Sequence, residues 1–167
     1  MKRSLLLVLL LLTACVPVTV TAVFPTSSPV SEIPLSPTAD VEMETAFAQA
    51  HATLHEFIQR IATPNASRTF AALKVRFELP DGTSQDIWCD NVTYIDGQFT
   101  GNMGDDIPAL RLAFDDRITI PAADIVDWMV VENDKLIGGF TIRLAYSRMT
   151  PEEQQLFLND AGYSVDE

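Results

Sequence analysis

The stretch LKVRFELPDGTSQDIWCDNVTY, residues 73–94, decides the fold class because it reads as two strands joined by a turn. Apolar and charged side chains alternate along its first part, as is typical of a strand with one buried and one solvated face. The apolar positions are Leu73, Val75, Phe77 and Leu79. Pro80, Asp81 and Gly82 then predict a turn, after which residues 86–94 run back along the first strand. The stretch therefore predicts an antiparallel β-hairpin.

More strands are predicted on the C-terminal side of this hairpin. A turn at Asp96 leads into residues 98–103, and residues 110–131 contain two further strands. Residues 135–146 are expected to pair back on the strand before them. Together these segments predict a curled antiparallel sheet of about five to six strands.

Helices are predicted before and after the sheet. Residues 40–64 carry apolar side chains at alternating spacings of four and three, which is typical of an amphipathic helix. The apolar positions are Met43, Phe47, Ala50, Leu54, Phe57 and Ile61. Asp40 is expected to cap the start of this helix and Pro64 to end it. Residues 150–153 form a capping box that predicts a short C-terminal helix. The predicted fold class is therefore α+β, with the first helix packed on the sheet in a single domain at residues 40–163.

Residues 1–14 have the layout of a secretory signal peptide. Two basic residues near the start precede the apolar run 5–12, which is too short to span a membrane. The segment LTAC, residues 12–15, resembles the bacterial lipobox, in which the signal is cut before a cysteine that carries a diacylglycerol. The resemblance implies that Cys15 is lipid-modified and holds a lipoprotein on the extracytoplasmic face of the cell membrane or outer membrane. A plain secretory cut is the alternative.

Composition narrows the classes of partner. Residues 15–39 are rich in proline, threonine and serine and predict a tether between the lipid and the domain. The chain has 11 basic and 23 acidic residues, and loss of Lys2 and Arg3 takes its formal charge from −12 to −14. This acidity disfavours nucleic acid, whose binding depends on Lys and Arg at the phosphates. It also disfavours docking on anionic lipid beyond the anchor, and it favours a basic protein partner.

Few side chains indicate catalysis. Cys89, the second of two cysteines, is expected to be a small buried hydrophobe rather than a nucleophile. His51 and His55 lie one helical turn apart, a spacing that can hold a metal, but the glutamate of the HExxH motif is missing. The acidic pairs at 105–106 and 115–116 are expected to be solvated, with cation binding or acid–base work as the alternative. The sequence therefore assigns no catalytic residue, cofactor or metal site.

Six residues form a candidate binding surface: Trp88, Asp127, Trp128, Gly138, Gly139 and Arg143. Trp128 is expected either to fill the core or to anchor a partner, and the two apolar rows around it favour a strand covered on both faces. Gly138 and Gly139 inside a predicted strand indicate a bend or the close approach of another backbone. Arg143 is expected to pair with Asp127 across the hairpin, an arrangement that would also hold a small polar ligand.

Several motifs occur in an order that carries a resemblance. They are Trp88, Gly97 with Phe99 and Gly101, Asp127 with Trp128, and GGFTIR at residues 138–143. From about residue 43 to residue 149 the chain resembles the bacterial YegJ-like family, catalogued as domain of unknown function 2314. That family has no established activity or catalytic residues, so the resemblance implies a fold and carries over no mechanism.

Two functions of different classes remain. The first is a lipid-anchored module at the cell envelope that holds a protein or a small polar ligand through the curled sheet, without catalysis. The second is an envelope enzyme that uses acidic residues with a bound metal, recruiting His51 and His55. The lack of a GxSxG motif, of a phosphate-binding glycine loop and of any histidine in the sheet region disfavours the enzyme. A spacer that only packs is a third alternative.

Overall fold

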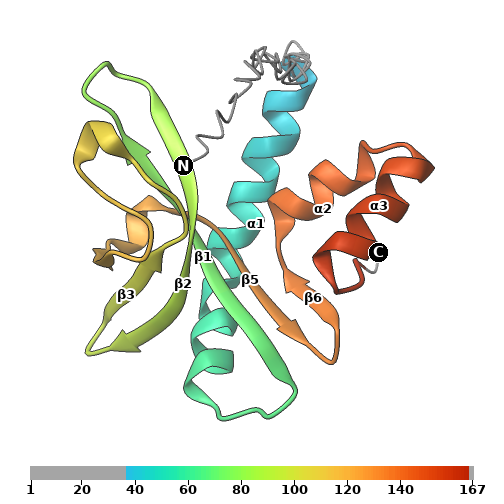
Figure 1. Cartoon of the computed structure of the whole chain (residues 1–167), viewed down its shortest axis with the longest axis horizontal. Helices are drawn as coiled ribbons and strands as arrows, with labels where there is room; N and C mark the ends of the chain where they lie inside the picture. Colours follow the sequence, from blue (N-terminus) through green and yellow to red (C-terminus); the bar gives the residue numbers. More distant parts are fainter. Residues whose placement is uncertain (1–36, 166–167) are drawn as a thin grey trace, which may run out of the picture. The chain divides into compact units, whose positions relative to one another are not determined.

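The computed structural model describes residues 37–165 (Figure 1). The predicted signal peptide, Cys15 and most of the tether lie outside the described residues. The elements are α1 (Pro37–Ala62), β1 (Arg68–Glu78), β2 (Ser84–Ile95), β3 (Gln98–Met103), η1 (Pro108–Leu110), β4 (Arg117–Ile120), η2 (Ala122–Asp124), β5 (Ile125–Glu132), β6 (Lys135–Gly138), α2 (Phe140–Ser147) and α3 (Pro151–Ala161). No helix in this part of the chain has both the length and the apolar composition to cross a membrane.

The first helix, α1, differs slightly from its predicted bounds. It begins at Pro37, so Asp40 lies inside the helix and the predicted cap at Asp40 is wrong. Proline suits a first helical position because the N–H that it lacks has no partner there. The helix ends at Ala62, before Pro64, as expected from the restriction that proline places on the residue before it.

The six strands form one antiparallel sheet in the order β4-β3-β2-β1-β5-β6. This confirms the predicted hairpin and meander, because β1, β2 and β3 are consecutive in both sequence and sheet. Leu73 in β1 lies opposite Cys89 in β2 on one side and opposite Trp128 in β5 on the other. The predicted α+β plan is therefore confirmed, with β2 and β1 at the centre of the sheet.

Apolar side chains form two clusters. The larger contains α1 residues, among them Phe57, together with Leu73, Trp128 and Val130. The smaller contains Ala72, Met129, Val131 and Leu136, with Ile142 and Tyr163 packed against it. All eight residues of β5 are buried, and its alternating side chains divide between the two clusters. The predicted strand with two covered faces is thus confirmed, because each face of β5 contributes to an apolar cluster.

Residues 135–146 do not form the single strand that was predicted. The strand β6 ends at Gly138, and the chain then enters α2 at Phe140. Gly138 and Gly139 have positive φ angles of 69° and 62°, a conformation that turns the chain out of the sheet and that glycine adopts without strain. The predicted bend at this glycine pair is therefore present, but it begins a helix rather than curling a strand.

The edge strand β6 is covered by the rest of the chain. The Leu136 N–H donates to the Ser164 carbonyl at 2.9 Å, and the Arg143 guanidinium donates to the Leu136 and Gly138 carbonyls at 2.6 and 2.8 Å. Unpaired strand edges recruit other strands, so these contacts protect the β6 edge from pairing with another chain.

Candidate functional site

The side chain of Asp127, a residue of β5, reaches the N-terminus of α2. Its Oδ2 accepts hydrogen bonds from the Thr141 N–H at 2.8 Å and the Thr141 hydroxyl at 2.7 Å. Its Oδ1 accepts from the N–H groups of Phe140 at 3.2 Å and Trp128 at 2.8 Å. Burial raises the pKa of Asp127, and these hydrogen bonds oppose the rise. The carboxylate therefore caps a helix whose own N-cap residue, Gly139, has no side chain.

Trp128 is a core residue. It is 1% exposed, and its Nε1 donates to the Ala50 carbonyl at 3.2 Å and to the Thr53 hydroxyl at 3.1 Å. Its ring lies 5.8 Å from that of Phe57 and 6.0 Å from that of Phe140. Of the two roles weighed from the sequence, the core role is the one that the structure shows, because the side chain joins α1 and α2 to the sheet.

The glycine pair is required by close packing. A Cβ on Gly138 would lie 2.5 Å from the Trp128 carbonyl oxygen, and one on Gly139 would lie 2.8 Å from Cδ2 of Leu136. The Gly139 N–H also donates to the Trp128 carbonyl at 2.7 Å. The close backbone approach that was the alternative to a bend is therefore present as well.

Arg143 lies on α2 rather than on a strand. Its guanidinium donates to the Gly138 and Leu136 carbonyls, and within residues 37–165 the Asp127 carboxylate accepts from Trp128, Phe140 and Thr141 instead. The predicted pair between Arg143 and Asp127 is wrong, because the chain leaves the sheet before Arg143.

Trp88 is half-buried beside this junction. The Lys74 ammonium lies 5.6 Å from the centre of the Trp88 ring and donates to the Thr141 hydroxyl at 3.2 Å. Thr141 is 4% exposed and donates in turn to Asp127. The candidate residues are thus brought together, but as a strand-to-helix junction whose polar groups are used in folding.

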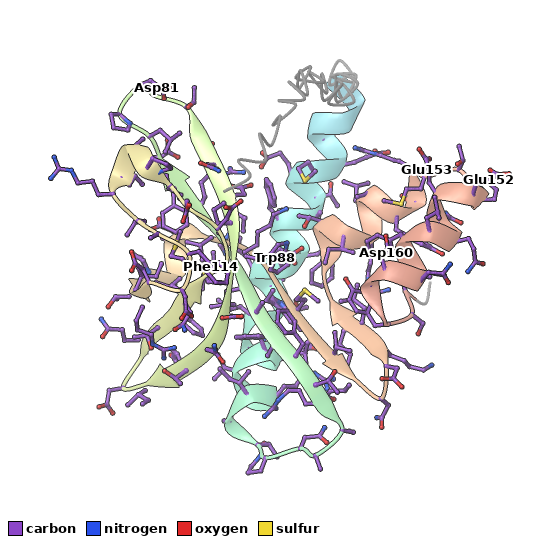
Figure 2. All side chains as sticks on the ribbon, in the orientation of Figure 1. Asp81, Trp88, Phe114, Glu152, Glu153 and Asp160 are labelled. Carbon is purple, nitrogen blue, oxygen red and sulfur yellow. The ribbon has the colours of Figure 1, made fainter. Side chains whose placement is uncertain are left out.

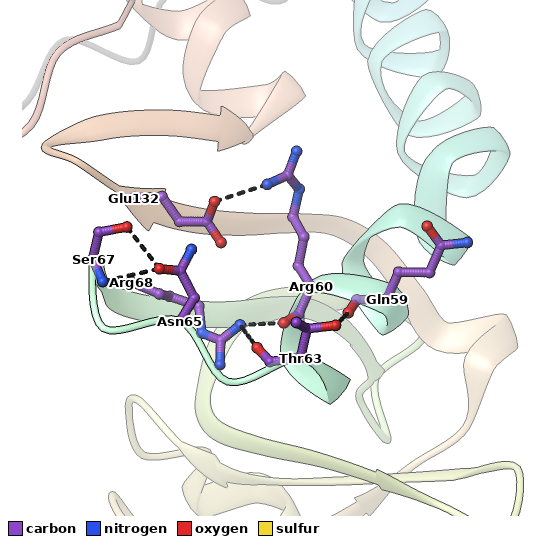
Figure 3. A network of polar contacts seen from close by, with 7 residues as sticks. All are labelled: Gln59, Arg60, Thr63, Asn65, Ser67, Arg68 and Glu132. Carbon is purple, nitrogen blue, oxygen red and sulfur yellow. Dashed lines mark hydrogen bonds and ion pairs between the residues drawn. The ribbon is translucent and has the colours of Figure 1, made fainter.

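A second group of polar residues surrounds a hollow of about 400 Å³ at the C-terminal end of α1 (Figure 3). We call it the polar hollow. It is lined by Glu56, Gln59, Arg60, Thr63, Asn65 and Glu132. Arg60 Nη1 donates to Glu132 Oε2 at 2.8 Å, and the Glu132 side chain is only 10% exposed. The walls of the hollow therefore carry both signs of charge.

Arg68 holds the base of the polar hollow in place. Its guanidinium donates to the Arg60 carbonyl, and to the Thr63 carbonyl at 3.1 Å (Figure 3). The last carbonyls of a helix have no partner within the helix, so this cation satisfies the end of α1. Asn65 Oδ1 accepts from the Ser67 N–H at 3.0 Å and from the Ser67 hydroxyl at 2.7 Å, which orders the loop between α1 and β1.

The sheet opens between β1 and β2. Their pairing runs from Glu78 opposite Ser84 to Leu73 opposite Cys89, and beyond that pair the strands diverge (Figure 1). Residues 68–71 of β1, residues 90–92 of β2 and Ile61 of α1 line a hollow of about 260 Å³ there. We call this opening the sheet split.

A bulge in β2 accompanies the sheet split. Asn91 has a φ of 47°, and the pairing of β2 with β3 shifts between Asp90 and Thr93. Arg117 fixes this bulge, since it donates to the Asn91 carbonyl at 2.6 Å and to the Thr93 and Thr100 hydroxyls at 3.0 and 2.6 Å.

Backbone groups of β1 face the sheet split. The Trp128 carbonyl accepts from Gly139, so the backbone groups of Trp128 point away from β1 and those of Met129 point toward it. Ala72 lies opposite Met129, and its backbone groups therefore face β5. Successive residues of a strand direct their backbone groups to opposite sides, so the N–H and carbonyl of Ala71 face the sheet split. No residue of β2 pairs with Ala71 there.

Cys89 is buried with 0% exposure and belongs to the larger apolar cluster. Burial raises the pKa of its thiol to about 11, and the nearby Asp90 adds to the rise. A thiol in this state is a weak nucleophile near neutral pH, because the reactive form is the thiolate. The expectation that Cys89 is a small buried hydrophobe is confirmed.

The remaining sequence candidates are exposed. His51 and His55 lie on the exposed side of α1, and within residues 37–165 no group of three or more Asp, Glu, His and Cys side chains is arranged to hold a metal ion. The acidic pairs order their own loop: Asp106 accepts from the Phe114 N–H at 2.6 Å and Asp116 from the Ala113 N–H at 2.8 Å.

Residues 40–165 match the family described as "Uncharacterized protein conserved in bacteria (DUF2314)". The chain belongs to the DUF2314 family. The resemblance drawn from the sequence motifs is thereby confirmed, and the match covers the whole described domain except the first turn of α1.

Two curated relatives share about a third of the aligned residues with this DUF2314 chain. The uncharacterized protein YegJ of Escherichia coli (strain K12) is 32% identical over 103 residues, which are 60% of this chain and 64% of YegJ. A putative ankyrin repeat protein of Neisseria meningitidis serogroup B is 33% identical over 103 residues, 58% of this chain and 39% of that protein. The alignment thus spans less than two thirds of either relative. No solved structure matches the chain significantly.

Proposed function

We propose that this DUF2314 protein is a lipid-anchored interaction module at the cell envelope that takes an extended segment of a partner protein into the sheet split. One observation carries the proposal: β1 and β2 part after Leu73 and Cys89 and leave unpaired strand edges on both sides of an open hollow. An extended peptide can add to such an edge through its backbone hydrogen bonds.

The lining of the sheet split suits an extended chain. Ala71 offers an N–H and a carbonyl, and Ile61 forms an apolar floor between the strands. Phe70, 41% exposed, is available for apolar contact with alternate side chains of the added strand. Backbone pairing provides affinity and such side-chain contacts provide specificity.

Charge favours a basic partner. The chain has 23 acidic against 11 basic residues, and acidic side chains such as Glu152, Glu153 and Asp160 lie on α3 (Figure 2). Complementary charge speeds the encounter of two proteins and selects against acidic partners. The partner segment is therefore expected to carry Lys or Arg at its ends.

The envelope location rests on the LTAC segment that ends at Cys15. A lipid on Cys15 would hold the domain at the membrane, and two or more acyl chains make such anchoring stable. The test replaces Cys15→Ser. Wild type is expected to incorporate labelled palmitate and to enter the detergent phase, while the variant stays aqueous; an unlabelled, aqueous wild type would refute the anchor.

Photocrosslinking in native membranes tests the interaction. A benzophenone side chain is placed at Thr69 or Asn91, which line the sheet split, and as a control at Thr119, an exposed threonine of β4. Positions 69 and 91 are expected to mark the same short segment of one partner, and position 119 none of it. If all three positions give the same adducts, or none does, the proposal fails.

A further inference from the structure

We infer that the polar hollow binds a small zwitterion of the α-amino-acid type, with its carboxylate on Arg60 and its ammonium on Glu132. This site goes beyond the proposed interaction, because none of the residues that line the polar hollow line the sheet split. The two sites can therefore be tested apart.

The size and lining of the polar hollow suit a small polar molecule. Its volume of about 400 Å³ falls within the roughly 300–1,000 Å³ of ligand sites. The six lining residues are all polar or charged, so they offer hydrogen bonds rather than apolar contact. A ligand with several charged or polar groups is therefore favoured over an apolar one.

The ion pair in the wall is incompletely satisfied. Arg60 donates to Glu132 through Nη1, while Arg60 Nε is buried and has no partner within the described residues. A guanidinium can present two parallel N–H groups to one carboxylate, and the pair with Glu132 uses one hydrogen bond. Arg60 therefore has unused capacity for a second carboxylate.

The balance of charge selects a zwitterion. A simple anion that takes Arg60 from Glu132 leaves a largely buried carboxylate without its cation, and a simple cation on Glu132 leaves Arg60 unpaired. A molecule with both charges replaces each partner of the pair by a group of the same sign. Glu56, the second carboxylate of the lining, adds to the attraction for the ammonium group.

The surrounding contacts keep the site open. Arg68 fixes the Arg60 and Thr63 carbonyls, and Thr63 donates through its hydroxyl to the Gln59 carbonyl at 3.0 Å. These contacts hold the backbone on either side of Arg60, and none of them involves the Arg60 side chain. Exchange of the ion pair for the ligand therefore needs side-chain rotation and no change of fold.

The test uses L-glutamine and two analogues that each lack one charge, glutaramate without the ammonium and 4-aminobutanamide without the carboxylate. Binding to the full chain is followed by NMR on the Arg60 Nε–Hε signal. L-Glutamine is expected to shift this signal saturably. Each analogue is expected to bind at least about ten-fold more weakly, which corresponds to about 1.4 kcal/mol of binding free energy. Equal affinity for the three probes overturns the inference. The absence of a saturable shift up to a probe concentration of about 10 mM, where only very weak binding would be missed, overturns it as well.

The variant Glu132→Gln separates ligand binding from a structural role. It frees Arg60 from its partner, so glutaramate is expected to bind better than to wild type and L-glutamine worse. Asp86→Asn is the matched control, because it breaks another ion pair, between Asp86 and Arg76 at 2.8 Å, outside the polar hollow. An unchanged ranking of the probes in a folded Glu132→Gln variant also overturns the inference.

Discussion

The Asp127 carboxylate on β5 accepts two hydrogen bonds from Thr141, at 2.8 Å from its N–H and 2.7 Å from its hydroxyl, and so caps α2 from a different element. The cap joins the Asp-Trp motif to the GGFTIR motif, which lie on opposite sides of the β5–β6 turn. These motifs are characteristic of the family resemblance, and the structure uses them to turn a strand into a helix.

Replacement of Asp127→Ala is expected to lower the free energy of unfolding by about 2–4 kcal/mol, because it leaves buried donors of Phe140 and Thr141 without an acceptor. Urea denaturation measures the change. Asp160→Ala on the exposed side of α3 serves as the control and is expected to change the value by less than about 0.5 kcal/mol. Equal effects of the two substitutions would show that the cap does not stabilise the fold.

The pH dependence of stability follows from the same carboxyl group. Burial raises the pKa of Asp127 above its ordinary value of 3.8, so the folded protein holds this proton more tightly than the unfolded chain. Its contribution to stability is fully present below pH 3.8 and is lost as the pH rises through the folded pKa. Titration of the Asp127 carboxyl carbon by NMR is expected to give a midpoint above 3.8. A midpoint below that value contradicts the assignment.

Gly138→Ala is expected to destabilise the protein by about 2–4 kcal/mol, because its Cβ would lie 2.5 Å from the Trp128 carbonyl oxygen and its φ is positive. Gly97→Ala is the matched control: its φ is also positive, at 83°, but no atom lies within 4 Å of the added Cβ. The control carries the backbone strain alone, at about 1–2 kcal/mol. The clash is disproved if both variants melt at the same temperature.

Cys89 is expected to resist thiol reagents in the folded protein, because its thiol is buried and has a pKa of about 11. In a Cys15→Ser chain it is the one remaining thiol. Labelling at pH 8 is expected only after addition of denaturant, whereas an added Thr69→Cys is labelled at once. Rapid labelling of Cys89 in the native chain would instead indicate a reactive site.

Local patterns predicted much of the fold. The alternation in residues 73–79 and the turn at Pro80 correctly placed the β1–β2 hairpin, since both signals lie within one short segment. The two apolar rows around Trp128 correctly predicted a strand with both faces covered, because a strand buried on both faces carries apolar residues at successive positions.

Contacts between distant residues were beyond such patterns. The helix α2 depends on Asp127, which no periodicity in residues 140–147 reveals, and a short apolar run is ambiguous between strand and helix. The polar hollow depends on Arg60 and Glu132, which are 72 positions apart. The sheet split accompanies a bulge at Asn91 that Arg117 holds from another strand. No sequence motif marked Asn91 or Arg117.

Amide hydrogen exchange at Ala71, compared with Ala72, tests whether a partner segment adds as a strand in the sheet split. The Ala72 N–H faces β5 and is expected to exchange slowly in the isolated protein, whereas the Ala71 N–H faces the sheet split and is expected to exchange quickly. In the complex with the partner captured from position 69, the Ala71 N–H is expected to exchange as slowly as the Ala72 N–H. Exchange at Ala71 that stays fast in that complex would contradict strand addition in the sheet split.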